Sequence, residues 1–176
     1  PSLYHPSHSL VRVVPSGQRE DLDGFFGSVG AHIRQYGAAA YYEPVADRIT
    51  MPAPDLFDDY AQYYATLAHE LSHWTGHKTR LDRNLKNRFG SRAYAAEELV
   101  AELSSAILGA ELGLPVDHLD NHASYIAHWI ALLQSDERAM LTAAARAEDA
   151  ASYLLARGGK LMGEDVADSD AISEAA

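Results

Sequence analysis

The sequence predicts one mostly helical α+β domain, and three observations lead to this fold class. The chain has 176 residues, which suits a single domain because domains usually contain about 100–200 residues. Apolar residues recur at steps of three and four in several long segments, as they do on the buried side of a helix. Two short runs, at 40–43 and 48–51, have the Tyr, Ile and Thr content of strands. We expect an irregular segment at 1–17, the domain at 18–157 and an acidic, disordered tail at 158–176.

The first half of the domain is predicted to hold one helix and one pair of strands. Residues 18–36 are predicted to form a helix, although three glycines weaken it. Its apolar positions follow helical spacing: Leu22, Phe25, Phe26, Val29 and Ile33. The runs at 40–43 and 48–51 flank a turn at 44–47, and prolines end the second run. These features favour a small sheet.

The second half is predicted to be helical. We expect four helices, each opening at a residue whose side chain can cap it. They run from Asp58 or Asp59 to Gly76, from Ser91 to Glu111, from Asp120 or Asn121 to Leu133, and from Ser135 or Asp136 to Leu155.

The composition argues against several classes of function. The chain has no cysteine, which excludes a disulfide framework, a thiolate metal site and a cysteine nucleophile, and which fits a reducing cytoplasm. No apolar run reaches the ~18–20 residues of a membrane span, and no signal segment opens the chain. The net charge of −11 argues against broad nucleic-acid binding. Because the chain begins at Pro1, we expect a processed product or an excised domain.

His69, Glu70 and His73 form the pattern HExxH on the first of the four helices. Imidazoles four residues apart project from one face of a helix, close enough to share a metal ion, and neutral imidazole nitrogen suits Zn²⁺. Glu70 is offset by one residue, so its carboxylate can lie beside a water at the metal and take its proton. The alternative is a pair of core histidines beside a solvated glutamate.

A catalytic zinc needs a third protein ligand and one open position. The next helix offers Glu97, Glu98 and Glu102. Glu98 and Glu102 share a face, whereas Glu97 points roughly 100° away from Glu98. We assign Glu98 as the ligand and Glu102 as the residue that orients a ligand imidazole through its free N–H, while the reverse assignment stays open. A salt-bridged helix face is the alternative, but an unpaired carboxylate is costly on a largely buried helix.

Tyr94 and His77 are the weaker candidates. Tyr94 lies one turn before Glu98, where its hydroxyl could donate to a developing oxyanion, although plain core packing with a satisfied hydroxyl is the favoured interpretation. His77 lies one turn beyond His73, and a further ligand on one straight helix strains the geometry. We therefore expect His77 to be a polar residue of the helix end or of the pocket around the site.

With these residues, the chain resembles the zincin-like metallopeptidase domain of ArdC-type antirestriction proteins. The same domain occurs with TraC-type plasmid primases and in polyvalent phage proteins. The resemblance runs from about Gly30 to about Gly113. The segments that match the family are Ala40–Tyr42, Asp47–Ile49, Met51–Pro52, His69–His77, Arg80–Leu81, Phe89–Ser91, Tyr94–Ala95 and Glu97–Glu102.

The resemblance implies a gluzincin-type fold, in which a small sheet packs beside the HExxH helix and a glutamate-bearing helix crosses nearby. It implies that the strand at 48–51 borders the cleft and pairs with an extended substrate. In this family an N-terminal domain binds single-stranded DNA, and the whole protein shields incoming plasmid DNA from restriction enzymes. We expect that N-terminal domain to be missing here, so antirestriction activity is implied for the parent protein only.

We therefore predict a zinc-dependent metallopeptidase domain that acts on a peptide or protein in the cytoplasm, away from membranes. A set of two histidines and a glutamate discriminates poorly among divalent ions, so Mn²⁺ and Co²⁺ stay open. The alternative is a non-hydrolytic binding module with a structural metal. In that alternative the basic stretch from Lys78 to Arg92 docks single-stranded DNA or a protein partner.

Overall fold

The computed structural model describes residues 16–85, 91–114, 131 and 137–160. The elements are α1 (Ser16–Ser28), β1 (Ile33–Gln35), β2 (Tyr41–Glu43), β3 (Arg48–Met51), the 3₁₀ turn η1 (Pro54–Leu56), α2 (Tyr60–Thr75), α3 (Arg92–Glu111) and α5 (Glu137–Arg157). The prediction of a mostly helical α+β fold is confirmed. Apart from residue 131, the helix predicted from Asp120 or Asn121 to Leu133 lies outside the described residues, as does most of the predicted tail.

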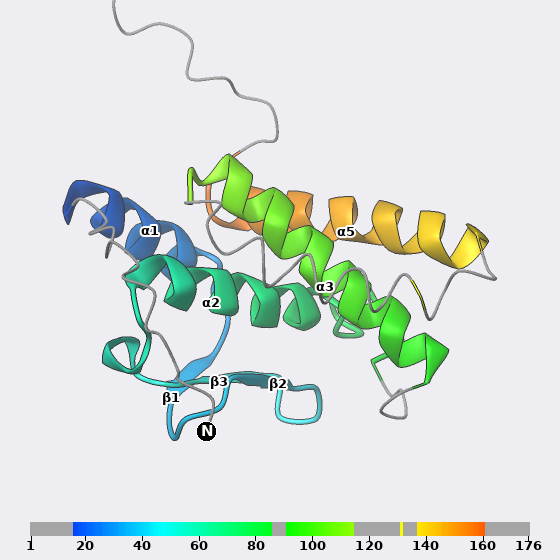
Figure 1. Ribbon diagram of the computed structural model, residues 1–176, viewed down its shortest axis with the longest axis horizontal. Coiled ribbons are helices and arrows are strands. Elements are labelled where there is room, and N and C mark those ends of the chain that lie inside the picture. Colours follow the sequence, from blue (N-terminus) through cyan, green and yellow to red (C-terminus); the bar gives the residue numbers. More distant parts are fainter. Residues whose placement is uncertain (1–15, 86–90, 115–130, 132–136, 161–176) are drawn as a thin grey trace, which may run out of the picture.

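Helix α2 lies in the middle of the molecule, between the sheet and the pair formed by α3 and α5 (Figure 1). It contacts β2 and β3 on one side and α3 and α5 on the other. The helix that carries the HExxH pattern is therefore covered on two sides. Among the described residues, no helix combines the length and the apolar character needed to cross a membrane.

The sheet has three strands in the order β1–β3–β2. Strand β1 pairs with β3 in parallel, with Ile33 opposite Ile49. Strand β2 pairs with β3 antiparallel, with Tyr42 also opposite Ile49. Because β3 has a partner on each side, the expectation that residues 48–51 pair with a substrate is wrong. The strand that presents an edge beside α2 is β2.

The predicted helix at 18–36 is wrong in its second half. Helix α1 begins at Ser16, two residues earlier than expected, and ends at Ser28. Gly30 follows with a φ of 79°, a left-handed conformation that glycine adopts without strain and that breaks the helix. Ile33, which fits the helical spacing of the sequence, lies in β1 instead.

The caps of α2 and α3 are as predicted. The Asp59 carboxylate accepts a hydrogen bond from the Gln62 N–H at the start of α2, and the Ser91 hydroxyl accepts one from the Tyr94 N–H at the start of α3. Each cap satisfies a backbone donor that has no partner inside its helix. Helix α2 ends at Thr75, next to the expected stop at Gly76.

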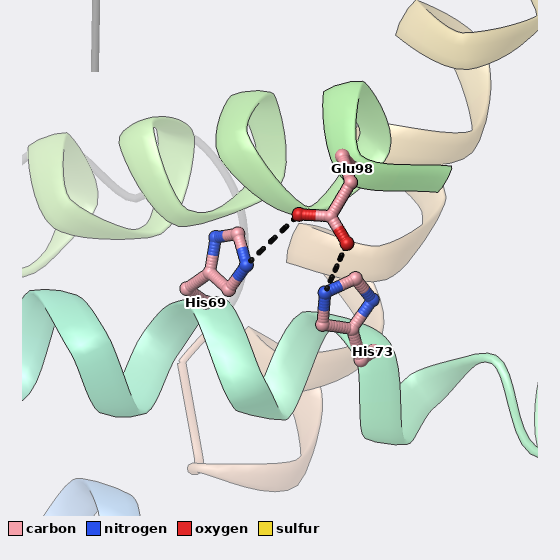
Figure 2. Close-up of side chains that lie close together, drawn as sticks. All are labelled: His69, His73 and Glu98. Carbon is pink, nitrogen blue, oxygen red and sulfur yellow. Dashed lines mark ion pairs between the residues drawn. The ribbon is translucent and has the colours of Figure 1, made fainter. Parts of the chain in front are cut away.

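One apolar core joins α1, β3, α2 and α5. Phe26 of α1 stacks on Tyr64 of α2 at 5.4 Å between ring centroids. Ile49 of β3, Leu71 of α2 and Leu154 of α5 are each fully buried in the same cluster. This packing fixes the rotation of α2 about its axis, so that its histidines face α3 (Figure 2).

Candidate metal centre

His69 and His73 of α2 converge on Glu98 of α3 (Figure 2). The Nε2 atom of His69 lies 3.7 Å from one Glu98 oxygen, and the Nε2 atom of His73 lies 3.6 Å from the other. One ligand atom from each residue can be chosen so that all three lie within 4.8 Å of one another. The structure thus brings together the two histidines and the glutamate that the sequence nominates.

The outer nitrogen of each imidazole faces a second glutamate of α3. His69 Nδ1 lies 3.6 Å from Glu102, and His73 Nδ1 lies 3.2 Å from Glu97. A carboxylate at Nδ1 favours the tautomer that carries its proton there, which leaves the Nε2 lone pair directed at the shared point. Glu102 lies beside the outer nitrogen of His69, the position predicted for an orienting residue. Glu97 has the same position toward the other histidine, and sequence reasoning missed that role.

Arg83 holds Glu97 in place from behind. Its Nε and Nη2 atoms donate to the two Glu97 oxygens at 3.0 and 2.9 Å, and only 3% of its side chain is exposed. Its remaining donors bind the C-terminal turn of α2, at the Ser72 carbonyl (2.6 Å) and the Thr75 hydroxyl (2.8 Å). A fork of this kind orients a carboxylate more strictly than a single contact does.

Glycine at position 76 makes room for this arginine. A Cβ atom there would lie 3.0 Å from Arg83 Nη2 and 2.9 Å from Leu85 Cδ2, closer than packed atoms tolerate. The Gly76 backbone itself is right-handed, with a φ of −74°. Close approach of the Leu85 and Arg83 side chains, rather than a left-handed turn, favours glycine at the end of α2.

The charges of these groups follow from burial and from their neighbours. Burial would raise the pKa of Glu97, but the hydrogen bonds from His73 and Arg83 outweigh it and lower that pKa. Burial would lower the pKa of His73, but Glu97, Glu70 and Glu98 together raise it. Glu97 and Arg83 therefore form a buried ion pair against the imidazole.

Glu70 is buried next to the histidines. Only 8% of the residue is exposed, and burial raises the pKa of its carboxyl to about 7, with Glu98 raising it further and His73 opposing the shift. The backbone of Tyr42 in β2 also opposes the shift and lowers this pKa. Glu70 thus lies close to His73, Glu98 and strand β2, and its role as general base stays a prediction.

Tyr94 also reaches the site. Its hydroxyl hydrogen-bonds with Glu98, and burial, followed by the charge of Glu98, raises the pKa of the phenol to about 12. The phenol therefore keeps its proton near neutral pH and can act as a donor.

His77 does not join the cluster. Its Nδ1 atom lies 2.8 Å from the Thr79 hydroxyl, on the exposed turn after α2. It lines a separate cavity of about 570 Å³ near the β2–β3 turn, together with Val45, Lys78 and Asp82. Helix α2 has ended before His77, and the group of possible metal ligands does not include this residue.

Two residues of the basic stretch are committed to internal contacts. Arg83 binds Glu97, as described, and Arg80 binds Asp47 at the β2–β3 turn. The side chains of Arg80 and Arg83 are 8% and 3% exposed. Neither guanidinium is presented to solvent as a phosphate-binding surface would require.

The donor set fits a divalent ion. Two imidazole nitrogens and one carboxylate oxygen are a ligand set used by catalytic zinc, and the same set accepts Mn²⁺. The far nitrogens of both imidazoles have carboxylate partners, as metal-bound histidines usually do.

This fold and site define a class of protein. The chain belongs to the zincin-like metallopeptidase family, whose model matches residues 20–146. The family resemblance drawn from the sequence is confirmed.

Among particular relatives, protein y4eC of Sinorhizobium fredii, described as uncharacterized, is 46% identical over 146 residues, which are 82% of this chain and 48% of that protein. A DNA primase TraC of Escherichia coli is 48% identical over 120 residues, 68% of this chain and 8% of the primase. The crystal structure of Mn(II)-bound antirestriction protein ArdC from plasmid R388 matches with a TM-score of 0.70 at 40% identity. This match covers 90% of the present chain and 57% of ArdC. The metal-free form of ArdC matches with a TM-score of 0.68. The chain thus spans about half the length of y4eC and of ArdC.

Proposed function

We propose that this chain is a metal-dependent peptidase domain in which His69, His73 and Glu98 hold a divalent ion. The observation that carries the proposal is the convergence of these three side chains, with the glutamate Glu70 buried beside them. When bound there, a divalent ion polarises the scissile carbonyl and makes a water a stronger nucleophile. Zinc is the first candidate from the donor set, and manganese is the second because ArdC was crystallised with Mn(II).

Each residue around the ion has a distinct task in this proposal. Glu70 takes a proton from the attacking water and returns it to the leaving amine. Tyr94 donates a hydrogen bond to the oxyanion that develops on the peptide carbonyl. Glu97 and Glu102 keep the imidazole rings oriented. The substrate lies along β2, since this strand presents the sheet edge beside α2.

The test is Glu70→Gln, which keeps the shape of the side chain but removes its ability to accept a proton. We expect metal content equal to that of the parent, while cleavage of a peptide library falls by about 10²–10⁴-fold. Glu148→Gln on the exposed surface of α5 removes the same charge elsewhere and should cleave like the parent. If Glu70→Gln and the parent cleave equally well, this mechanism is wrong.

The role of the whole protein is a separate proposal. ArdC is an antirestriction protein of a plasmid, and TraC is a primase. We infer that the present domain serves a cytoplasmic protein of a mobile element, and that single-stranded DNA binds only through a domain outside this chain. In a restriction digest, the full-length protein that contains this domain should protect plasmid DNA, whereas the domain alone should not.

A further inference from the structure

Arg80 fastens the β2–β3 turn to the end of α2. Its Nη1 atom donates to Asp47 Oδ2 at 3.0 Å, and its Nη2 atom donates to Asp47 Oδ1 and to the Tyr42 hydroxyl, the latter at 3.2 Å. The Tyr42 hydroxyl in turn donates to Asp47 at 2.8 Å. We call Arg80, Asp47 and Tyr42 the Arg80 clamp.

The other side of the clamp is helix α2. Arg80 Nε donates to the Trp74 carbonyl at 2.6 Å, and the guanidinium lies 3.9 Å from the centre of the Trp74 ring. Arg80 therefore binds one residue of β2, one of the turn and one of α2, all at once. The guanidinium can meet these demands because its planar fork offers five donors and an apolar face.

Strand β2 also meets α2 at a second point, which is the catalytic glutamate of the proposed mechanism. The Ile49 N–H donates to the His32 carbonyl on the β1 side of β3. Tyr42, which lies opposite Ile49, is therefore in a pair without mutual hydrogen bonds, and its N–H points away from β3. The Tyr42 backbone is also among the groups that lower the pKa of the Glu70 carboxyl.

We propose that Arg80 is a positioning residue, which holds β2 against α2 so that the Tyr42 N–H fixes the Glu70 carboxylate. The inference rests on the proposed function only for its effect on turnover, since the contacts of the clamp are present in the chain whether or not it is a peptidase. One residue, Tyr42, makes both attachments: its hydroxyl joins the clamp and its amide joins Glu70. A loosened clamp frees the amide from Glu70 while the three metal-binding side chains, which lie on α2 and α3, keep their places.

The first measurement is amide hydrogen exchange, which needs no peptidase activity. In Arg80→Ala, the Tyr42 amide should lose its protection, because its acceptor is no longer held beside it. The Glu43 amide, which points toward β3, should keep its protection in the same variant. Equal protection of the Tyr42 amide in the parent and in Arg80→Ala overturns the proposal.

The second measurement is steady-state kinetics with metal titration. Misplacement of a catalytic group by a small distance costs up to about a hundredfold in rate, so kcat of Arg80→Ala should fall by roughly ten- to a hundredfold. Metal affinity and KM should stay near those of the parent. A purely structural role would instead lower the fraction of folded, metal-loaded protein and leave kcat per loaded molecule unchanged, and that result overturns the proposal.

Two gentler variants keep the test decisive if Arg80→Ala fails to fold. Tyr42→Phe removes only the hydroxyl that joins β2 to the clamp, and Asp47→Asn keeps a residue that tolerates the positive φ of 47° at this position. Both variants should lose less protection at the Tyr42 amide than Arg80→Ala does, and their kcat should fall by less. If both keep the parent's Tyr42 protection and kcat, the proposal is wrong.

Arg48→Ala is the matched control. Arg48 also pairs with an acidic residue of the hairpin, Glu43, at 2.8 Å, but this pair joins β3 to β2 and does not involve α2. Tyr42 protection and kcat should therefore stay at parent values. If the parent cleaves no peptide, the proposed function fails, whereas the exchange measurement still decides the clamp.

Discussion

Helix α2 contributes to two regions of opposite chemistry. In the apolar region, Tyr64 and Leu71 pack among aromatic and aliphatic side chains from α1, β3 and α5. In the polar region, His69 and His73 meet the glutamates of α3, with Arg83 behind them. Burial stabilises the first region without any specific partner, whereas each charge in the second needs a partner of its own.

The polar region satisfies this need. Among the residues that the structure describes, Arg34 Nε is the only buried side-chain nitrogen or oxygen without a hydrogen-bond partner, and it lies in β1, outside the polar region. The buried hydroxyls of Ser72 and Ser104 also meet between α2 and α3, at 3.0 Å. A core filled with paired ionisable groups stabilises a fold less than apolar packing would, so the polar region contributes less to stability than its burial suggests.

Breaking one partner of the buried ion pair should have the largest effect. Arg83→Met leaves Glu97 buried without its guanidinium, which should lower the free energy of unfolding by about 3–5 kcal/mol in urea denaturation of the metal-free protein. Arg83→Met with Glu97→Gln should regain much of this loss, because no charge is then left unpaired. Leu71→Ala, the control in the apolar region, should lose about 2–5 kcal/mol that no second substitution of this kind restores. Additive losses in the double variant would contradict the assignment of the pair.

A smaller effect is expected from Glu102→Gln, which weakens the partner of His69. The amide still fills the space, so stability should change little. Metal affinity should fall by roughly 10–100-fold, since partners of ligand imidazoles set the orientation and basicity of the ring. A calorimetric titration with Zn²⁺ measures this, and an unchanged dissociation constant would argue against an orienting role for Glu102.

The smallest effect concerns the more exposed ion pair of the Arg80 clamp. The hydrogen bond from Arg80 lowers the pKa of Asp47 below its ordinary 3.8 against the opposing effect of burial, and Tyr42 and His77 lower it further. A lowered pKa means that the folded state binds the proton more weakly, so this contribution is complete above pH 3.8 and is lost as the pH falls through the folded pKa. The melting temperatures of the parent and of Asp47→Asn should therefore converge in acid, and a constant difference would contradict the clamp.

The sequence predicts α2 and α3 well because local signals define them. Caps, a glycine and the apolar spacing all act within one helix, and they place Asp59, Ser91 and the HExxH pattern correctly. Glu98 lies beside both histidines, as its place on the same face of α3 as Glu102 suggests, and its role as a metal ligand stays a prediction.

What the sequence misses depends on contacts between distant segments. Strand β1 forms because β3 offers a parallel edge, and Ile33 fits a helix equally well by spacing. Glu97 points away from Glu98, yet an imidazole has two nitrogens in different directions, so a neighbouring glutamate can serve the outer one. From the sequence alone, Arg80 and Arg83 are interpreted as part of a basic loop. Their acidic partners lie 33 and 14 residues away in the chain, so local patterns do not indicate the pairing.

The most direct test is metal stoichiometry in three proteins. After loading with Zn²⁺ and removal of excess ion, the parent should retain one ion per chain, and the double variant His69→Ala, His73→Ala should retain none. Arg48→Ala, whose side chain lies on the hairpin, should retain one as well. If the double variant binds as much zinc as the parent, the ion is held elsewhere, and the metal centre between α2 and α3 does not exist.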